Sequence, residues 1–156
     1  MSDWTHVVGV VVLDTYNFNS EYLNGLPSEE DVIRSFKEYL GEISTFFDYK
    51  EYVKLPRGSE GSLRYNVRID NYSGYNSFVV IDIYGDLRDY SSQKQIIKWF
   101  TETFDETKLG EEANILPYIN NAILTVENEY SDEKSVVVWK NDKTYQVIKI
   151  DKTDTI

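Results

Sequence analysis

The chain has 156 residues, of which 41% are hydrophobic, and this is enough for the core of one domain. It contains no cysteine and a single histidine, His6, which excludes disulfides and cysteine-ligated metal sites. Its net charge of −11 argues against broad nucleic-acid binding, because the phosphate backbone would be repelled.

The first predicted element is a strand at Val7–Leu13, a β-branched run interrupted only by Gly9 and typical of a buried central strand. This run is too short to span a bilayer, and residues 1–3 lack the basic flank of a signal peptide. We therefore expect a cytoplasmic protein without a membrane segment. A helix is predicted from Ser28, which suits the N-cap, to Gly41, which suits the helix end.

The middle of the chain predicts a hairpin followed by a second helix. Leu63–Ile69 alternates apolar and polar residues, and Phe78–Tyr84 is again apolar, with a glycine-bearing turn at Tyr72–Ser77 between them. Gly85–Tyr90 is predicted to be a loop. Ser92–Gln95 forms a capping box that opens a helix with an apolar side at Ile96, Ile97, Trp99, Phe100 and Phe104.

The last third predicts a polar connection and three strands. Asp105–Asn114 is polar, and Ala122–Val126 has the composition of a strand. Val136–Trp139 and Tyr145–Ile150 flank Asn141-Asp142, a signal for a hairpin whose turn has positive φ.

The first six elements follow the order strand, helix, strand, strand, helix, strand, which is that of the ferredoxin-like, or split βαβ, arrangement. We therefore expect an α+β fold with an antiparallel sheet, both helices on one face and an added C-terminal hairpin. Residues 1–156 would form a single domain, with a ferredoxin-like core over 1–105, an extra strand and hairpin over 106–150, and a frayed tail over 151–156. The other sheet face would be covered by the hairpin, a partner chain or a ligand, and a homo-oligomer is favoured.

Motifs for catalysis are missing from the sequence. It has no cysteine nucleophile, nucleophile elbow or Walker motif, and His6 is expected to be a structural, hydrogen-bonded histidine. Asp82, Asp86 and Asp89 would suit Mg²⁺ with the help of a substrate phosphate, but acidic residues after strands are common without a metal. We expect a protein that is not an enzyme and has no cofactor.

The arginines give the strongest signal for a binding site. Four of the five in the chain lie between positions 57 and 88, around the glycine-bearing loop Gly58–Ser62. Arginine forks and loop amides suit phosphates, and tyrosine faces suit nucleobases. The predicted site for a small anionic nucleotide comprises Arg57, Ser59, Ser62, Arg64, Tyr65, Arg88 and Tyr90. The alternative is that Arg64 and Arg68 form surface ion pairs that need no ligand.

Three motifs resemble a family of small proteins from bacteriophages of Gram-positive bacteria. They are Trp4-Thr5-His6-Val7, Pro56-Arg57-Gly58-Ser59-Glu60-Gly61-Ser62 and Gly85-Asp86-Leu87-Arg88-Asp89, within roughly the first 105 residues. The resemblance implies a phage-encoded protein in the cytoplasm of the infected bacterial host. It further implies an inhibitor of host defence, such as an anti-CBASS sponge that sequesters a cyclic nucleotide.

Two other hypotheses stay open. The acidic surface would suit a protein–protein inhibitor, such as a nucleic-acid mimic or an anti-restriction protein, although the Asp and Glu residues are scattered and such charge also serves solubility. A metal-assisted phosphodiesterase using Asp82, Asp86 and Asp89 is the least favoured.

Overall fold

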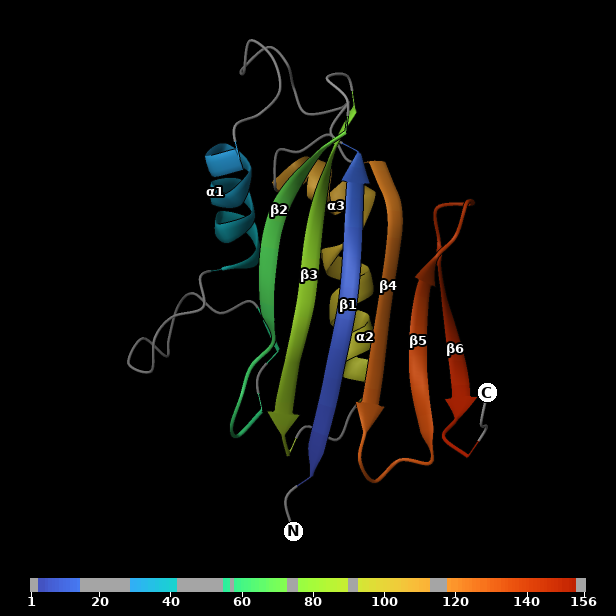
Figure 1. Ribbon diagram of the computed structural model, residues 1–156. Helices are drawn as coiled ribbons and strands as arrows, with labels where there is room; N and C mark the ends of the chain where they lie inside the picture. The colour runs from blue at the N-terminus through green and yellow to red at the C-terminus, as the bar shows by residue number, and fades with distance from the viewer. Residues whose placement is uncertain are drawn as a thin grey trace.

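The computed structural model describes residues 3–14, 29–41, 55–56, 58–72, 76–89, 93–112 and 118–153. In these residues the strands form one layer and the helices form a second layer on one side of it (Figure 1). The strands are β1 (Trp4–Asp14), β2 (Arg64–Tyr72), β3 (Asn76–Arg88), β4 (Tyr118–Asn128), β5 (Glu133–Trp139) and β6 (Tyr145–Asp151). The helices are α1 (Glu29–Leu40), α2 (Gln93–Thr103) and α3 (Glu106–Glu112). None of the helices in these ranges is long and apolar enough to cross a membrane.

The strands form one six-stranded sheet in the order β2-β3-β1-β4-β5-β6, with antiparallel pairing between all neighbours. The α+β class is therefore confirmed, and so is the central position of β1, which lies between β3 and β4. The pairing places Val8 of β1 opposite Tyr84 of β3 on one side and Thr125 of β4 on the other.

One face of the sheet carries the hydrophobic core. In β1 the side chains of Val7, Val11 and Leu13 are buried, whereas Val8 between them is 65% exposed. The prediction of a buried strand is thus correct for only one face, because β1 alternates between a covered side and the opposite side.

The three helices pack against the covered face. Phe36 of α1, Phe100 of α2 and Leu109 of α3 are fully buried in the same cluster as the inward side chains of the strands. The Tyr39 hydroxyl joins α1 to α2 by donating to the carbonyl of Thr103 at 2.5 Å. Figure 1 shows α2 and α3 behind the sheet, alongside β1 and β4.

Two segments differ from the sequence-based expectation. Residues 85–88, predicted to be a loop, continue β3 beside the start of β1, where Leu87 pairs with Thr5. The polar connection predicted after Asp105 contains α3 instead. Asp105 caps this helix, because its Oδ1 accepts from the amides of Thr107 (2.8 Å) and Lys108 (3.2 Å).

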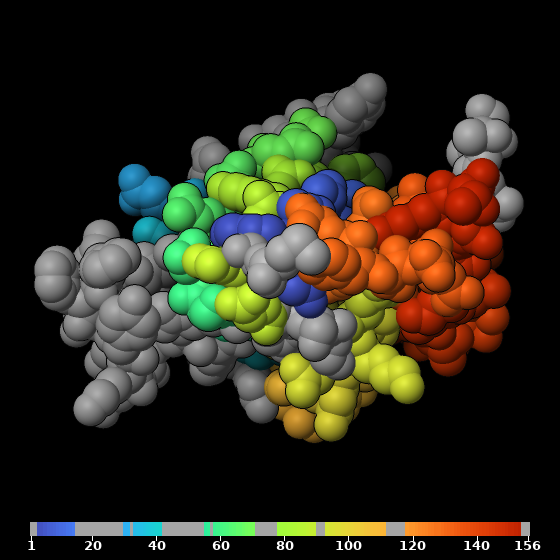
Figure 2. Space-filling view, turned by 90° about the horizontal axis from the view of Figure 1, so that it is seen from below, coloured from blue at the N-terminus to red at the C-terminus, as the bar shows by residue number. Residues whose placement is uncertain are grey.

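The C-terminal hairpin forms as predicted from β5 and β6, but its turn and its place differ. The positive φ falls on Lys143 (64°) rather than on Asn141 or Asp142, and Asp142 Oδ1 accepts from the amide and hydroxyl of Thr144. The hairpin does not cover the second sheet face. It extends the sheet beyond β4, as the red strands at one side of Figure 2 show.

Candidate binding face

The loop Gly58–Ser62, predicted to bind a nucleotide, folds onto the end of β3, and two of its backbone amides donate hydrogen bonds to carbonyls of the same chain. The Gly58 amide donates to Gly61 O (3.0 Å), the Ser59 amide to Arg88 O (2.9 Å), and the Arg88 amide to Glu60 O (3.0 Å). The amides of Gly58 and Ser59 are therefore occupied by the chain itself and are not directed at an anion.

Close packing explains the glycines of this loop. A Cβ atom on Gly58 would lie 2.3 Å from Arg88 O, and one on Gly61 would lie 2.1 Å from Asp86 O. Gly61 also has a φ of +76°, a conformation that side-chain-bearing residues avoid. The glycine pattern thus marks a tight contact between the loop and β3.

Acids neutralise Arg88 within the chain. Its Nη1 lies 2.5 Å from Glu60 Oε1, and its Nε lies 3.8 Å from Asp89 Oδ2. The Ser59 hydroxyl donates to the same Asp89 oxygen at 2.7 Å, and this hydrogen bond is the main cause that lowers the pKa of Asp89. Ser59 and Arg88 are thus neighbours as predicted, but both already have carboxylate partners.

Among the described residues, Tyr65 and Arg64 of the predicted site do not gather around this loop. Tyr65 points to the covered face, where its hydroxyl donates to Gly41 O at 3.0 Å, so its ring is not available for stacking on a base. Arg64, the next residue along β2, points to the opposite face and is exposed. Ser62 is half-buried beside the end of β3. Arg57 and Tyr90 lie outside the described residues.

The sheet face opposite the helices, which we call the open face, presents two rows of largely apolar side chains. The register places them side by side across the strands. The first row runs from β3 to β6 and consists of Tyr84, Val8, Thr125, Val136 and Ile148. The second row lies beside it and consists of Asp82, Val10, Ile123, Val138 and Gln146.

The open face is unusually accessible for so apolar a surface. Val8 is 65% exposed, Tyr84 45%, Ile148 38% and Ile123 37%. Figure 2 looks along the strands and shows α2 and α3, in yellow, on one side of the sheet only. In the part of the chain that the structure describes, no helix or strand packs over the open face. Contiguous exposed apolar surface of this kind marks binding sites.

The sequence carried a signal for this face. Val7, Val8, Val10, Val11 and Val12 place valine on both sides of one strand. Since an antiparallel sheet with a single helix layer buries only one side, the valines on the other side must be exposed or covered by something outside this layer.

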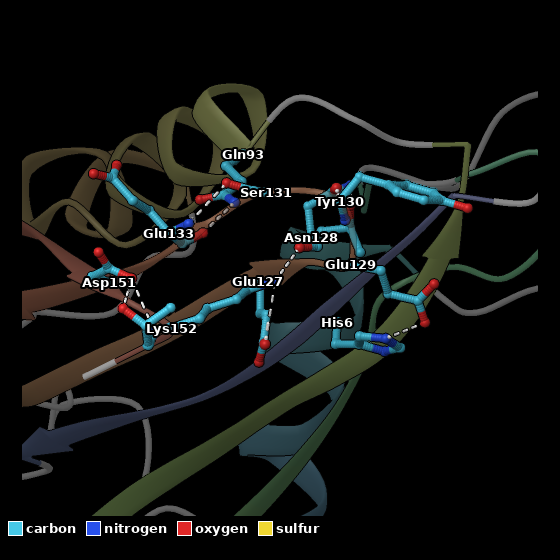
Figure 3. Close-up of polar contacts among 12 residues, drawn as sticks. His6, Gln93, Glu127, Asn128, Glu129, Tyr130, Ser131, Glu133, Asp151 and Lys152 are labelled. Carbon is cyan, nitrogen blue, oxygen red and sulfur yellow. Dashed lines mark hydrogen bonds and ion pairs between the residues drawn. The ribbon is translucent and has the colours of Figure 1, made fainter. Parts of the chain in front are cut away.

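A polar row borders the apolar rows towards the start of β1. It runs from Asp86 on β3 through His6 and Glu127 to Lys134 on β5. His6 Nδ1 lies 2.6 Å from Asp86 Oδ1, and Nε2 lies 3.1 Å from Glu129 Oε1; His6 and Glu129 point toward one another in Figure 3. The hydrogen bond with Asp86 is the main cause that raises the pKa of His6. The histidine is hydrogen-bonded, as predicted, at both ring nitrogens.

The acids that suggested a metal are dispersed. Asp82 lies 3.6 Å from Arg68 Nε, Asp86 contacts His6, and Asp89 accepts from Ser59. Over the described ranges, no group of three or more His, Asp or Glu side chains is arranged to hold a metal ion. The arrangement of Asp82, Asp86 and Asp89 therefore does not support the metal-assisted phosphodiesterase.

On the β2 side, two arginines border the open face. Arg64 lies directly opposite Tyr84 in the β2–β3 pairing, and Arg68 lies opposite Val80. The guanidinium of Arg68 already faces Asp82, whereas among the described residues no ion pair holds Arg64. Arg64 and Tyr84 therefore place an exposed cation beside an exposed aromatic ring.

Comparisons with protein-family models, with curated proteins and with solved structures find no match to the chain.

Proposed function

We propose that the protein is a non-catalytic binding protein that works through the open face. The observation that carries this proposal is the row from β3 to β6 in which Tyr84, Val8 and Ile148 are exposed and Val136 between them is half-buried. A soluble domain gains nothing in stability from exposed aliphatic side chains, so their retention in one contiguous row favours a role in binding.

We also propose a ferredoxin-like core as the framework of this face. Two features support it: β1 lies between β3 and β4, and α1 and α2 connect β1 to β2 and β3 to β4 along the chain. This core would end with β4, at Asn128, rather than at residue 105. The β5–β6 hairpin would then serve to widen the open face.

The ligand class that we propose first is a small nucleotide, held at the β2 side of the open face. Its support is the cross-strand pair Arg64–Tyr84, since a guanidinium suits phosphate and an exposed ring suits a base. Stacking of one base on a protein aromatic ring contributes roughly 1–3 kcal/mol. Of the seven residues predicted from the sequence, this pair keeps Arg64 and replaces Tyr65 with Tyr84.

The biological setting follows from the resemblance to phage proteins. The three motifs quoted above favour a phage-encoded protein in the cytoplasm of the infected bacterial host. Sequestration of a cyclic-nucleotide defence signal fits a domain that binds without hydrolysing, and we propose this anti-defence role. It rests on the resemblance and on the Arg64–Tyr84 pair.

A protein target is the second candidate. The aliphatic side chains of Val8, Ile123 and Ile148 favour it, because protein interfaces have an apolar centre with a polar rim. In this reading the protein is an acidic inhibitor of a host defence enzyme, and the charge of −11 gives it preference for basic partners.

Calorimetric titration with a panel of cyclic di- and trinucleotides separates the two candidates. A nucleotide sponge binds one of them, releases it intact on heating, and loses binding in Arg64→Ala and Tyr84→Ala. Arg34→Ala is the matched control, since Arg34 is an exposed arginine on α1, paired with Asp31. No binding to any member of the panel would overturn the nucleotide proposal and favour the protein target. Binding that survives both substitutions would overturn the site.

A further inference from the structure

We infer that a second copy of the chain covers the open face, with the two sheets packed face to face around a two-fold axis parallel to the strands. This inference goes beyond the ligand proposed above and does not depend on it. The pattern of apolar and charged side chains on the face favours this occupant.

The strand order fixes which strands would meet. In β2-β3-β1-β4-β5-β6, the middle of the sheet lies between β1 and β4. A two-fold axis at that position, running along the strands, places β1 over β4 of the second copy, β3 over β5, and β2 over β6. Every strand is then covered by a strand of the second copy, and each residue faces a residue from the same row of that copy.

The apolar rows would form the centre of this interface. Val8 would lie over Thr125 of the second copy, and Val10 over Ile123 of the second copy, next to the axis. Tyr84 would lie over Val136 of the second copy. These contacts remove from water Val8 and Tyr84, the apolar residues with the largest exposed fractions on the face, at 65% and 45%.

The polar row would be complementary to itself. Along one chain it reads Asp86, His6, Glu127 and Lys134, so that acidic and basic groups alternate. The two-fold axis reverses this order, which puts Asp86 over Lys134 of the second copy and His6 over Glu127 of the second copy. Each of these contacts occurs twice in the dimer.

Within one chain Asp86 and Lys134 cannot pair. Their strands, β3 and β5, are separated by β1 and β4, which puts them about 14 Å apart at the usual strand spacing of about 4.8 Å. Asp86 contacts His6 on its own side, whereas Lys134 lies opposite Glu127 in the β4–β5 register and the carboxylate of Glu127 is 3.4 Å from Lys152 Nζ. A second copy is what brings Asp86 and Lys134 together.

Charge also argues against the other symmetric arrangement. An axis running across the strands at the level of Tyr84 would place β3 over its own copy, with Asp82 facing Asp86. Like charges at an interface repel, so this packing is disfavoured. The face is large enough for a dimer, because two sheets of six strands remove on the order of the 1,000 Å² that a specific interface needs.

In this arrangement Arg64 and Tyr84 lie over Ile148 and Val136 of the second copy. The dimer contact and a base stacked on Tyr84 would both use the exposed ring of this residue. Dimerisation and nucleotide binding are therefore expected to compete at Tyr84.

The first experiment is sedimentation velocity over a range of concentrations, on the wild type and two matched variants. Val8→Glu puts a charge at the centre of the proposed interface and is expected to give a monomer. Val147→Glu is the control: Val147 is 45% exposed on β6 but lies on the other face, opposite the buried Val137, so its dimer is expected to persist. A wild type that is monomeric at concentrations on the order of 100 μM would overturn the inference. A dimer that is disrupted by Val147→Glu but not by Val8→Glu would also overturn the inference.

The second experiment exchanges the charges. In the Asp86→Lys homodimer the new lysine faces Lys134 of the second copy, and in the Lys134→Glu homodimer the new glutamate faces Asp86 of the second copy. Like charges then meet in each case, so both homodimers are expected to weaken. A mixture of the two variants restores opposite charges at both contacts, and a heterodimer is expected to form in preference to either homodimer. Because no contact within one chain can produce this preference, equal association of all three species would contradict the two-fold arrangement. Circular dichroism verifies that each variant is folded.

Discussion

Asp86 Oδ1 lies 2.6 Å from His6 Nδ1, on the open face of the sheet and at the border of its apolar rows. Glu129 approaches the other ring nitrogen at 3.1 Å, so the imidazole lies between two carboxylates. This arrangement favours the imidazolium form and raises the pKa of His6 above its ordinary value of about 6.5.

The stability of the fold should therefore depend on pH through His6. Because the pKa of the folded state is raised, this contribution is fully present below pH 6.5 and is lost as the pH rises through the raised value. Urea unfolding of the wild type and of His6→Gln at about pH 6 and about pH 8.5 measures it. The stability advantage of the wild type over His6→Gln should be larger at the lower pH. The change in this advantage should be less than about 1 kcal/mol, since the His6 side chain is 42% exposed and its ion pair is screened.

The comparison uses the difference between the two proteins, so that carboxylates common to both cancel. An advantage of the wild type that is the same at both pH values would show that His6 does not stabilise the fold through its charge.

Gly61→Ala should destabilise the protein strongly. The substitution forces a Cβ to within 2.1 Å of Asp86 O at a φ of +76°, so both the close contact and the backbone conformation oppose it. We expect a loss of more than about 2 kcal/mol in the free energy of unfolding. Gly110→Ala, within α3, is the control and should change this quantity by less than about 1 kcal/mol. Equal effects of the two substitutions would contradict the packing described for the loop.

Asn128→Ala should destabilise the end of the sheet where β1 and β4 meet. The buried Asn128 amide donates to Asp3 Oδ1 (2.8 Å) and Thr5 Oγ1 (2.9 Å), and its Oδ1 accepts from the Tyr130 amide (2.9 Å). Loss of these three hydrogen bonds, at a position where the Asn128 side chain is buried, should cost about 1–3 kcal/mol in the free energy of unfolding. Asn121→Ala, at an exposed position of the same strand, should cost much less by the same denaturation measurement. If Asn128→Ala left the free energy of unfolding unchanged, this network would have no role in stabilising the sheet.

Tyr145 should anchor the C-terminal hairpin to α2. Its hydroxyl donates to Phe104 O at 2.6 Å, its ring lies 5.5 Å from the ring of Phe100, and burial raises the pKa of the phenol well above its ordinary value. Tyr145→Phe removes only the hydrogen bond and should cost about 1 kcal/mol. Tyr145→Ala also removes the packing and should cost about 3 kcal/mol.

Hydrogen exchange of the β6 amides localises this effect. Faster exchange in β6 than in β1 for Tyr145→Ala is the expected result, and uniform acceleration over the whole sheet would argue against a local anchor.

The sequence predicted the elements whose signals are local. Helical spacing placed α2, the alternation from Leu63 to Ile69 placed β2, and the pattern after Val136 placed the hairpin. Each of these depends on neighbours within one element, so the residues themselves carry the information.

Features that depend on contacts between distant segments were missed. Gly85–Arg88 continues as a strand because β1 pairs with it, and Tyr65 is withdrawn from any site because its hydroxyl meets Gly41. The hairpin turn was placed at Asn141-Asp142 by composition, whereas the chain puts the positive φ on Lys143, which lies 3.5 Å from Glu106. The open face exists because the helices pack on one side of the sheet only. This placement depends on the whole fold and cannot be inferred from any single segment of the sequence.

The most direct test of the open face uses the absence of cysteine from the chain. Val8→Cys and Val147→Cys each introduce a single thiol at an exposed position, on the open face and on the other face respectively. The rate of thiol labelling is measured from dilute to concentrated protein, and with the nucleotides or protein target under test. Labelling at position 8 is expected to slow when the open face is covered by a second copy or a ligand, whereas labelling at position 147 is expected to be unchanged. Equal protection of both positions, or protection of position 147 alone, would contradict this expectation.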